Sequence, residues 1–179
     1  MEVYIAAVAV TVVLFVWVSW TATRVDRLHG RTASARASLD AALVRRAAAL
    51  QALASHSSAE LGPAREARLL ALASASLEAD ESVREAVEND LSRALRDIPA
   101  AADPALLADL TDAARRVALA RRFYNDAVRD TVSLRRGRVP RLFRLGGAEP
   151  LPAFFEIDDT IPAPSREPNP QPAPQQTQR

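Results

Sequence analysis

The stretch TASARASLDAALVRRAAALQALAS, residues 32–55, contains no glycine or proline and consists mostly of alanine and leucine. Both residues are among the best helix formers. Apolar side chains recur here by threes and fours, or by multiples of these, which is typical of an amphipathic helix. The sequence therefore predicts a long helix that ends near residues 55–58 and is broken at Gly62-Pro63. Its apolar face contains Val25, Leu28, Thr32, Ala35, Leu39, Ala42, Leu50 and Leu53.

Two further segments with helical spacing follow. The second is predicted over residues 63–98, because Pro63 suits a first turn and Pro99 disfavours helical geometry in the residue before it. The third begins at Asp103-Pro104, an N-cap followed by proline, and its helical pattern ends near Gly137. The second has an apolar face of Leu69, Ala73, Leu77, Val83, Val87, Leu91, Leu95 and Ile98. The third has Leu107, Leu110, Ala114, Val117, Arg121, Tyr124, Val128 and Thr131 on one face.

Upstream of the amphipathic region, residues 3–20 read VYIAAVAVTVVLFVWVSW and carry no charge. A helix of about 20 apolar residues is ~30 Å long and can cross a bilayer. A cleaved signal peptide is the alternative, but it requires a basic start and a shorter apolar run, whereas Glu2 is acidic. A membrane anchor is therefore favoured. The residues that identify the span are Val3, Tyr4, Leu14, Phe15, Trp17 and Trp20, with the tyrosine and the tryptophans near its ends as interfacial anchors.

Three arginines, Arg24, Arg27 and Arg31, directly follow the span. Basic residues beside a span favour the cytoplasmic side. They predict that the N-terminus lies outside, that the rest of the chain lies in the cytoplasm, and that the anchor lies in the cell (inner) membrane.

The three amphipathic segments must bury their faces against one another. The expected fold is all-α: an N-terminal transmembrane helix, then an antiparallel up-down bundle of three long helices, similar to a four-helix bundle. The expected domains are an anchor (1–23), a helical bundle (24–157) and a Pro/Gln-rich disordered tail (158–179). Phe154 and Phe155 are expected to pack back on the end of the bundle.

The composition argues against several kinds of chemistry. The chain has no cysteine, which excludes disulfides, zinc ribbons, Fe–S clusters and thiol catalysis. Its net charge of +1 gives no overall field that would attract nucleic acid. Neither His29 nor His56 has a glutamate three residues earlier, as a diiron bundle requires, and no Gly-rich phosphate loop is present. We therefore expect no enzymatic activity, no metal, no cofactor and no nucleic-acid partner.

Four short segments together resemble the bacterial LemA family. They are LDAALVRR (39–46), VENDLSRAL (87–95), ARRFYNDAVRD (120–130) and FFE (154–156), in this order after an N-terminal span. The third is the most specific. The motif residues that could form a shared interaction surface are Asp40, Arg45, Arg46, Glu88, Asn89, Arg121, Tyr124, Asn125 and Arg129.

The resemblance implies an N-out, C-in membrane protein with a cytoplasmic helical bundle and no established enzymatic activity or cofactor. The chain would be a divergent member, because the Pro-Asn that the family pattern has after Arg46 is missing here. Two interpretations of Tyr124 and Asn125 remain open. They could be core residues that find partners on a neighbouring helix, or they could join Asp40 and Asn89 in a polar cluster that fixes helix register or receives a partner.

Five arginines follow the third helix, namely Arg135, Arg136, Arg138, Arg141 and Arg144. In a three-helix bundle the third helix runs away from the membrane, so this cluster is expected ~45 Å from the bilayer. Binding to anionic lipid is then disfavoured, and a solvated surface or a macromolecular partner fits better.

These features favour a non-enzymatic scaffold that presents a cytoplasmic helical bundle to protein partners, with lipid contacting the N-terminal helix. The alternative is an accessory subunit of a membrane enzyme or transport complex. A homo-oligomer is possible in either case, because a three-helix rod could close its core against a second copy.

Overall fold

The computed structural model describes residues 1–99, 101–136 and 150–158, and this part of the chain is helical without strands. The side chains of residues 21, 22, 25, 26 and 29 are also outside the description. Apart from Asp158, the expected tail therefore lies outside the described residues, as do Arg138, Arg141 and Arg144. The helices are α1 (Glu2–His56), α2 (Ser58–Leu61), α3 (Pro63–Glu78), α4 (Arg84–Arg96) and α5 (Pro104–Arg135).

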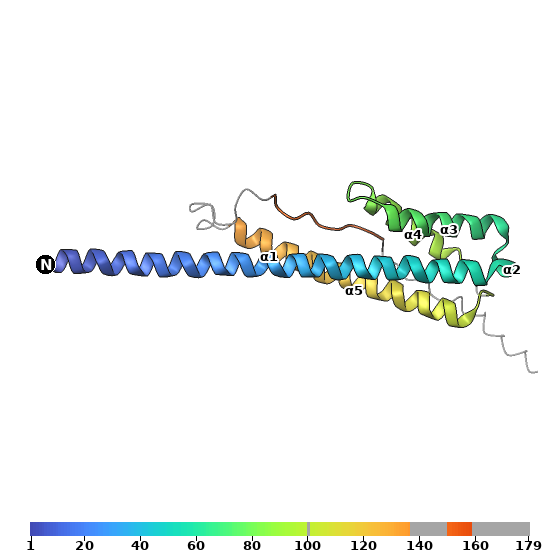
Figure 1. Ribbon diagram of the computed structural model, residues 1–179, viewed down its shortest axis with the longest axis horizontal. Helices are drawn as coiled ribbons and strands as arrows, with labels where there is room; N and C mark the ends of the chain where they lie inside the picture. The colour runs from blue at the N-terminus through green and yellow to red at the C-terminus, as the bar shows by residue number, and fades with distance from the viewer. Residues whose placement is uncertain (100, 137–149, 159–179) are drawn as a thin grey trace, which may run out of the picture.

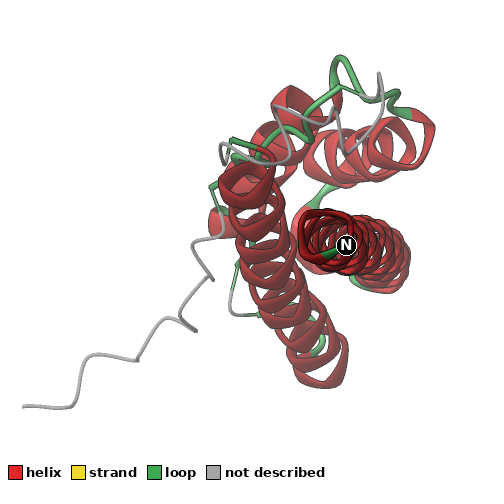
Figure 2. Ribbon diagram, turned by 90° about the vertical axis from the view of Figure 1, so that its left-hand side faces the viewer, coloured by secondary structure: helices red, strands yellow, loops and turns green. Residues whose placement is uncertain are grey.

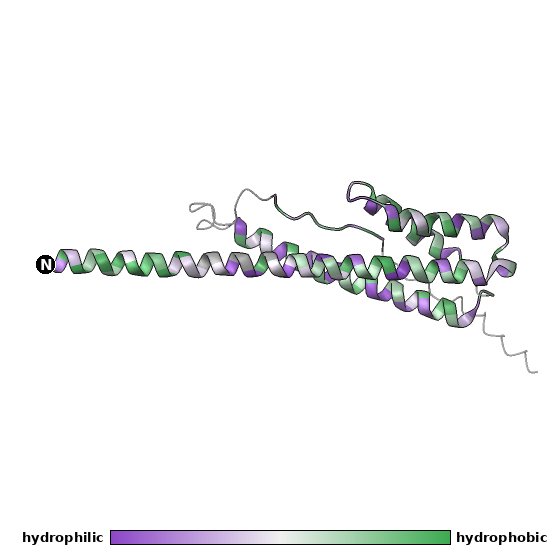
Figure 3. Cartoon of the chain, viewed as in Figure 1, coloured by the Kyte–Doolittle hydropathy of each residue, from purple (hydrophilic) through white to green (hydrophobic). Residues whose placement is uncertain are grey.

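α1 is one uninterrupted helix of 55 residues, and it is the longest element in Figure 1. Its first part, Glu2–Trp20, has a mean hydropathy of 2.3 and is not buried against the rest of the molecule. Figure 3 shows this part as mainly apolar, whereas polar and apolar residues alternate farther along. The described residues thus contain one helix long and apolar enough to span a membrane, a criterion that a signal sequence also meets.

α5 lies against α1 and runs in the opposite direction (Figure 1). Leu50 of α1 shares a buried cluster with Leu110, near the start of α5. Leu39 shares a second cluster with Val128, near the end of α5. Residue numbers therefore increase along α5 in the direction in which they decrease along α1, so the two helices are antiparallel.

The two helices also share a polar contact. The hydroxyl oxygens of Thr32 and Thr131 lie 2.9 Å apart, and both side chains are buried. Thr131 is therefore level with Thr32 along the shared axis of the two helices.

The prediction of one helix over residues 63–98 is wrong, since α3 and α4 are separate helices joined by residues 79–83. Asp80 makes the turn: its Oδ1 accepts bonds from the Ser82 hydroxyl at 2.6 Å and from the Ser82 and Val83 amides at 2.9 and 3.3 Å. These bonds, the hydroxyl first, hold the pKa of Asp80 below its ordinary value. Leu77 and Val83, expected in the core, are exposed beside this turn.

The extra reversal changes the direction of the last helix. α3 runs back along α1, α4 turns again, and α5 then runs toward the N-terminal part of α1 (Figure 1). Viewed along α1, α5 lies beside it, and α3 and α4 lie together across the top (Figure 2). The expectation that the end of the last helix is distal from the apolar segment is therefore wrong.

After α5, residues 150–158 form an extended segment, here called the strap, which lies along the helices (Figure 1). Phe155 and Ile157 are buried in the cluster that contains Leu39 and Val128. Phe154 points out and is 42% exposed. The strap thus completes the core on the flank of the helices, at the half nearer the apolar segment.

Candidate functional site

Two of the predicted motif residues, Arg46 and Glu88, form a buried ion pair between α1 and α4. Their side chains are 2% and 0% exposed. Glu88 Oε1 also accepts a bond from the Ser76 hydroxyl on α3 at 2.7 Å, and Arg46 Nη1 donates to the Ser92 hydroxyl at 3.2 Å. This network connects three helices through four side chains.

The network is not fully satisfied. Among the described residues, Arg46 Nε is a buried side-chain polar atom without a hydrogen-bond partner. A buried charge pair gains stability only when the remaining donors and acceptors are paired, because both ions lose their hydration. The arrangement therefore specifies which helix faces meet, and its role is structural.

Tyr124 and Asn125 on α5 hold the strap. The Tyr124 hydroxyl donates to the carbonyl of Ala153 at 2.9 Å. Asn125 bonds the backbone of Phe155 at two points: its Nδ2 donates to the carbonyl at 3.1 Å, and its Oδ1 accepts from the amide at 2.9 Å. The carboxamide thus substitutes for a neighbouring β-strand, since it offers one donor and one acceptor to the same residue.

The other end of the strap is held by α4. Asn89 Oδ1 accepts a bond from the Asp158 amide at 2.7 Å, and Glu85 Oε1 accepts one from the Glu156 amide at 2.9 Å. Arg96 forms an ion pair with the Asp158 carboxylate. The strap therefore bridges α5 and α4, and motif residues from two sequence segments converge on it.

Arg36, which the sequence analysis did not select, lies at the centre of this region. Its guanidinium carbon lies 5.6 Å from the ring centre of Tyr124 and 5.7 Å from that of Phe155. Burial lowers the pKa of Arg36, but the hydrogen bond with Tyr124 and the charges of Asp40 and Glu81 outweigh it and raise the pKa. The available signal was the i, i+4 spacing of Arg36 and Asp40, which pair at 3.5 Å.

The other motif residues lie outside this centre. Asp40 pairs with Arg36 and does not join Asn89, so the predicted cluster of Asp40, Asn89 and Tyr124-Asn125 is only partly assembled. Arg45 is exposed and Arg121 is half-buried. Arg129 is exposed and pairs with Asp126 at 2.6 Å.

The residues predicted to lie in a membrane are exposed along α1. Val3, Tyr4, Leu14, Phe15, Trp17 and Trp20 all show between 43% and 80% of their surface. The guanidinium of Arg24 lies 5.6 Å from the ring centre of Trp20, which is within cation–π range. The aromatic end of the apolar segment and the first arginine after it are therefore in contact.

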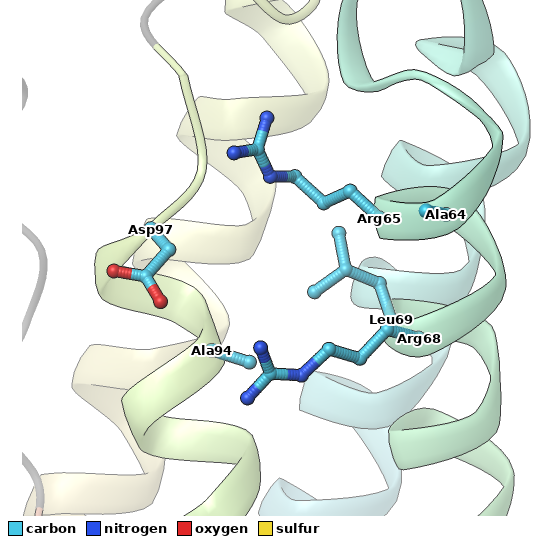
Figure 4. A pocket seen from close by; sticks show the side chains of 6 residues that line it. All are labelled: Ala64, Arg65, Arg68, Leu69, Ala94 and Asp97. Carbon is cyan, nitrogen blue, oxygen red and sulfur yellow. The ribbon is translucent and has the colours of Figure 1, made fainter.

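Several hollows mark the surface of the helical body. Figure 4 shows one of about 450 Å³ between α3 and α4, where Arg65 and Arg68 extend toward Asp97. A second, of about 470 Å³, lies between α1 and α5 and is lined mainly by apolar side chains.

Within the described ranges, no three His, Asp or Glu side chains are grouped as metal ligands would be. His56 is exposed, and its Nδ1 lies 2.8 Å from the Ala52 carbonyl of its own helix.

Comparisons with known proteins give no match. Neither a protein-family model, nor a curated protein, nor a solved structure matches the chain. The resemblance to the LemA family therefore rests on the quoted sequence segments.

Proposed function

We propose that this chain is a single-pass membrane protein that presents its helical body to protein partners in the cytoplasm and performs no catalysis. The observation that carries the proposal is the continuity of α1. The same helix supplies the exposed apolar segment Glu2–Trp20 and the buried residues Leu39–Leu53 of the core. An anchor joined to the body without a hinge holds that body at a fixed height above a bilayer. Membership of the LemA family is part of this proposal.

The orientation follows from charge. Arg24, Arg27 and Arg31 lie just beyond the apolar segment and favour the cytoplasmic side of a membrane. The body, which follows these arginines, would then be cytoplasmic, with the N-terminus outside.

The best surface for a protein partner is the apolar groove between α1 and α5. It is lined by alanines of both helices together with Leu119 and Phe123. Phe123 is 62% exposed and Leu119 is 54% exposed, and Val44 close by on α1 is 50% exposed. Grouped exposed apolar side chains commonly mark sites of protein association. No residue of the strap lines the groove, so a partner could bind there without displacing the strap.

Two measurements test the proposal. Reporter fusions after Arg179 and before Met1, followed by cell fractionation, should give a membrane-bound product with a cytoplasmic C-terminus. A shortened soluble product, or a C-terminus outside the cell, would overturn the anchor or its orientation.

The groove is tested by photocrosslinking from position 123 in intact cells, with Arg65 on α3 as a matched exposed control. We expect discrete protein adducts from position 123 and few from position 65. Adducts with the chain itself would indicate a homo-oligomer. A stoichiometric complex retained in mild detergent would favour the accessory-subunit alternative, and equal labelling at both positions would refute the groove as the interface.

A further inference from the structure

We propose that arginines of α1 and α5 together form a binding surface for the phosphate headgroups of anionic lipids, at the end of the helical body that faces the bilayer. This surface, here called the arginine collar, consists of Arg24, Arg27 and Arg31 of α1 and of Arg135 and Arg136, at the end of α5. The inference rests on the proposed membrane anchor. For Arg135 and Arg136, it reverses the expectation that the arginine cluster lies far from the membrane.

The height of α5 is fixed by the contact between Thr32 and Thr131. On α1, Thr32 lies ~18 Å beyond Trp20 at 1.5 Å per residue. α5 runs back from Thr131 toward the apolar segment, so Arg135 and Arg136 descend by a further ~6–7 Å. They reach a level ~11 Å beyond Trp20, where Arg27 lies on α1.

Arg135 lines a hollow of about 720 Å³ with Gly30 and Thr32 of α1, and the arginines of α1 line a separate hollow of about 430 Å³ between the two helices. Its lining includes Arg24, Arg27 and Arg31 from α1 and Asp130, Ser133 and Leu134 from the last turns of α5. Arg135 and Arg136 directly follow this lining in sequence. Residues 24–31 and 130–136 contain five arginines against the aspartates Asp26 and Asp130, so the region is strongly basic although the whole chain has a net charge of only +1.

Arg31 lies ~17 Å beyond Trp20 along α1, but the other four arginines lie in or just beyond the lipid headgroup layer. That layer is roughly 5–8 Å thick on each side of the hydrocarbon core. With Trp20 at the edge of the core, Arg24 falls inside the layer. Arg27, Arg135 and Arg136 fall a few ångströms beyond it, within reach of an extended side chain and within one Debye length of ~8 Å.

Local chemistry supports phosphate as the ligand. A guanidinium presents several donors in a plane and binds phosphate oxygens at two points. Arg135 Nη1 already donates to the carbonyl of Pro150 at 3.3 Å, which steadies the side chain at this end of the body. Arg136 is exposed.

The test uses the two tryptophans of the chain, Trp17 and Trp20, as reporters of nearby lipid. The full chain is reconstituted in phosphatidylcholine vesicles that contain a minor fraction of phosphatidylglycerol, with either one lipid or the other brominated. Bromine quenches tryptophan fluorescence at close range. We expect brominated phosphatidylglycerol to quench more strongly, per mole fraction, than brominated phosphatidylcholine, and we expect high salt to reduce the difference.

The variant Arg135→Gln with Arg136→Gln should reduce this preference by roughly twofold or more, because each arginine near the surface adds to the attraction. Arg136→Gln alone should give a smaller reduction, and it keeps the bond from Arg135 to Pro150. The matched control is Arg65→Gln with Arg68→Gln, which removes the same charge from an exposed site near the far end of the body. Helicity by circular dichroism verifies that each variant is folded.

The outcomes distinguish failure of the arginine collar from failure of the proposed membrane anchor. A preference that is unchanged in the α5 variants, or that falls equally in the control, would overturn the arginine collar, as would equal quenching by both lipids in the unmodified chain. Quenching by neither lipid would mean that the tryptophans are not at a membrane, and the proposed function itself would fail.

Discussion

At the scale of single residues, buried polar groups determine how the helices fit together. Arg46 and Glu88 meet where neither reaches solvent, and the two serines that support them come from different helices. A buried pair of this kind contributes little net stability, yet removing one partner is costly because the other charge stays buried alone. The pair therefore favours the one alignment of α1 with α4 in which the two charges meet.

The first prediction concerns this pair. Glu88→Gln removes the negative charge and should lower the free energy of unfolding by about 3–5 kcal/mol. Chemical denaturation in detergent, followed by circular dichroism, measures the change. Arg93→Gln removes an exposed arginine that pairs with Asp90, and it should cost less than about 1 kcal/mol.

A double variant, Arg46→Met with Glu88→Leu, completes the comparison. It should regain most of the stability lost in Glu88→Gln, because apolar side chains of similar size can replace a buried pair. A double variant as unstable as the single one would show that the pair is a net source of stability.

The second prediction concerns the strap. Asn125→Ala removes both bonds to Phe155 and should cost about 1–3 kcal/mol, because the backbone groups of a buried residue lose their partners. Hydrogen exchange of residues 151–158 should accelerate in this variant. Arg129→Ala, one turn away and exposed, should leave the exchange of the strap unchanged.

At the scale of elements, the sequence indicated most helix boundaries correctly. The end of α1 at His56, the start of α3 at Pro63 and the Asp103 cap of α5 all follow from residues with strong local preferences. The turn between α3 and α4 was missed because it contains no glycine or proline. Its signal was Asp80 followed by Ser82. The Asp80 carboxylate competes with the helix for the amides of Ser82 and Val83, and it also accepts a bond from the Ser82 hydroxyl.

The site could be predicted only in part, for a related reason. Tyr124, Asn125 and Asn89 were among the selected motif residues, but their partners are backbone atoms of the strap, which periodicity cannot place. Tyr124 and Asn125 read equally well as members of a helix–helix cluster. The choice between these interpretations depends on an extended segment more than 25 residues away in the chain.

The third prediction compares two glycines. Gly30 lies within α1, and a Cβ added there would meet nothing within 4 Å. Gly30→Ala should therefore stabilise the helix by about 0.5–1 kcal/mol. Gly62 links α2 and α3 at φ 74° and ψ 155°, a conformation that other residues avoid, so Gly62→Ala should cost about 1–3 kcal/mol. Thermal unfolding of both variants checks the opposite signs.

At the scale of the whole molecule, the apolar segment and the helical body share one helix, α1. None of Glu2–Trp20 is buried against the body, whose core begins with Thr32 and Leu39. Stability of the body should therefore be independent of the segment.

The fourth prediction follows from this separation. A chain that lacks residues 1–20 should unfold within about 0.5 kcal/mol of the full chain in the same detergent, because exposed residues away from the core contribute little. Loss of the cooperative transition in the shortened chain would show that the apolar segment packs on the body.

The unbroken α1 also makes the molecule a lever. Under the proposed anchoring, His56 lies ~54 Å beyond Trp20 along the same axis. Tilting the span by roughly 20°, as helices do when the bilayer is thinner than their apolar length, would swing the distal end sideways by ~18 Å. Bilayer thickness would then set how far from the anchor point the body can reach a partner.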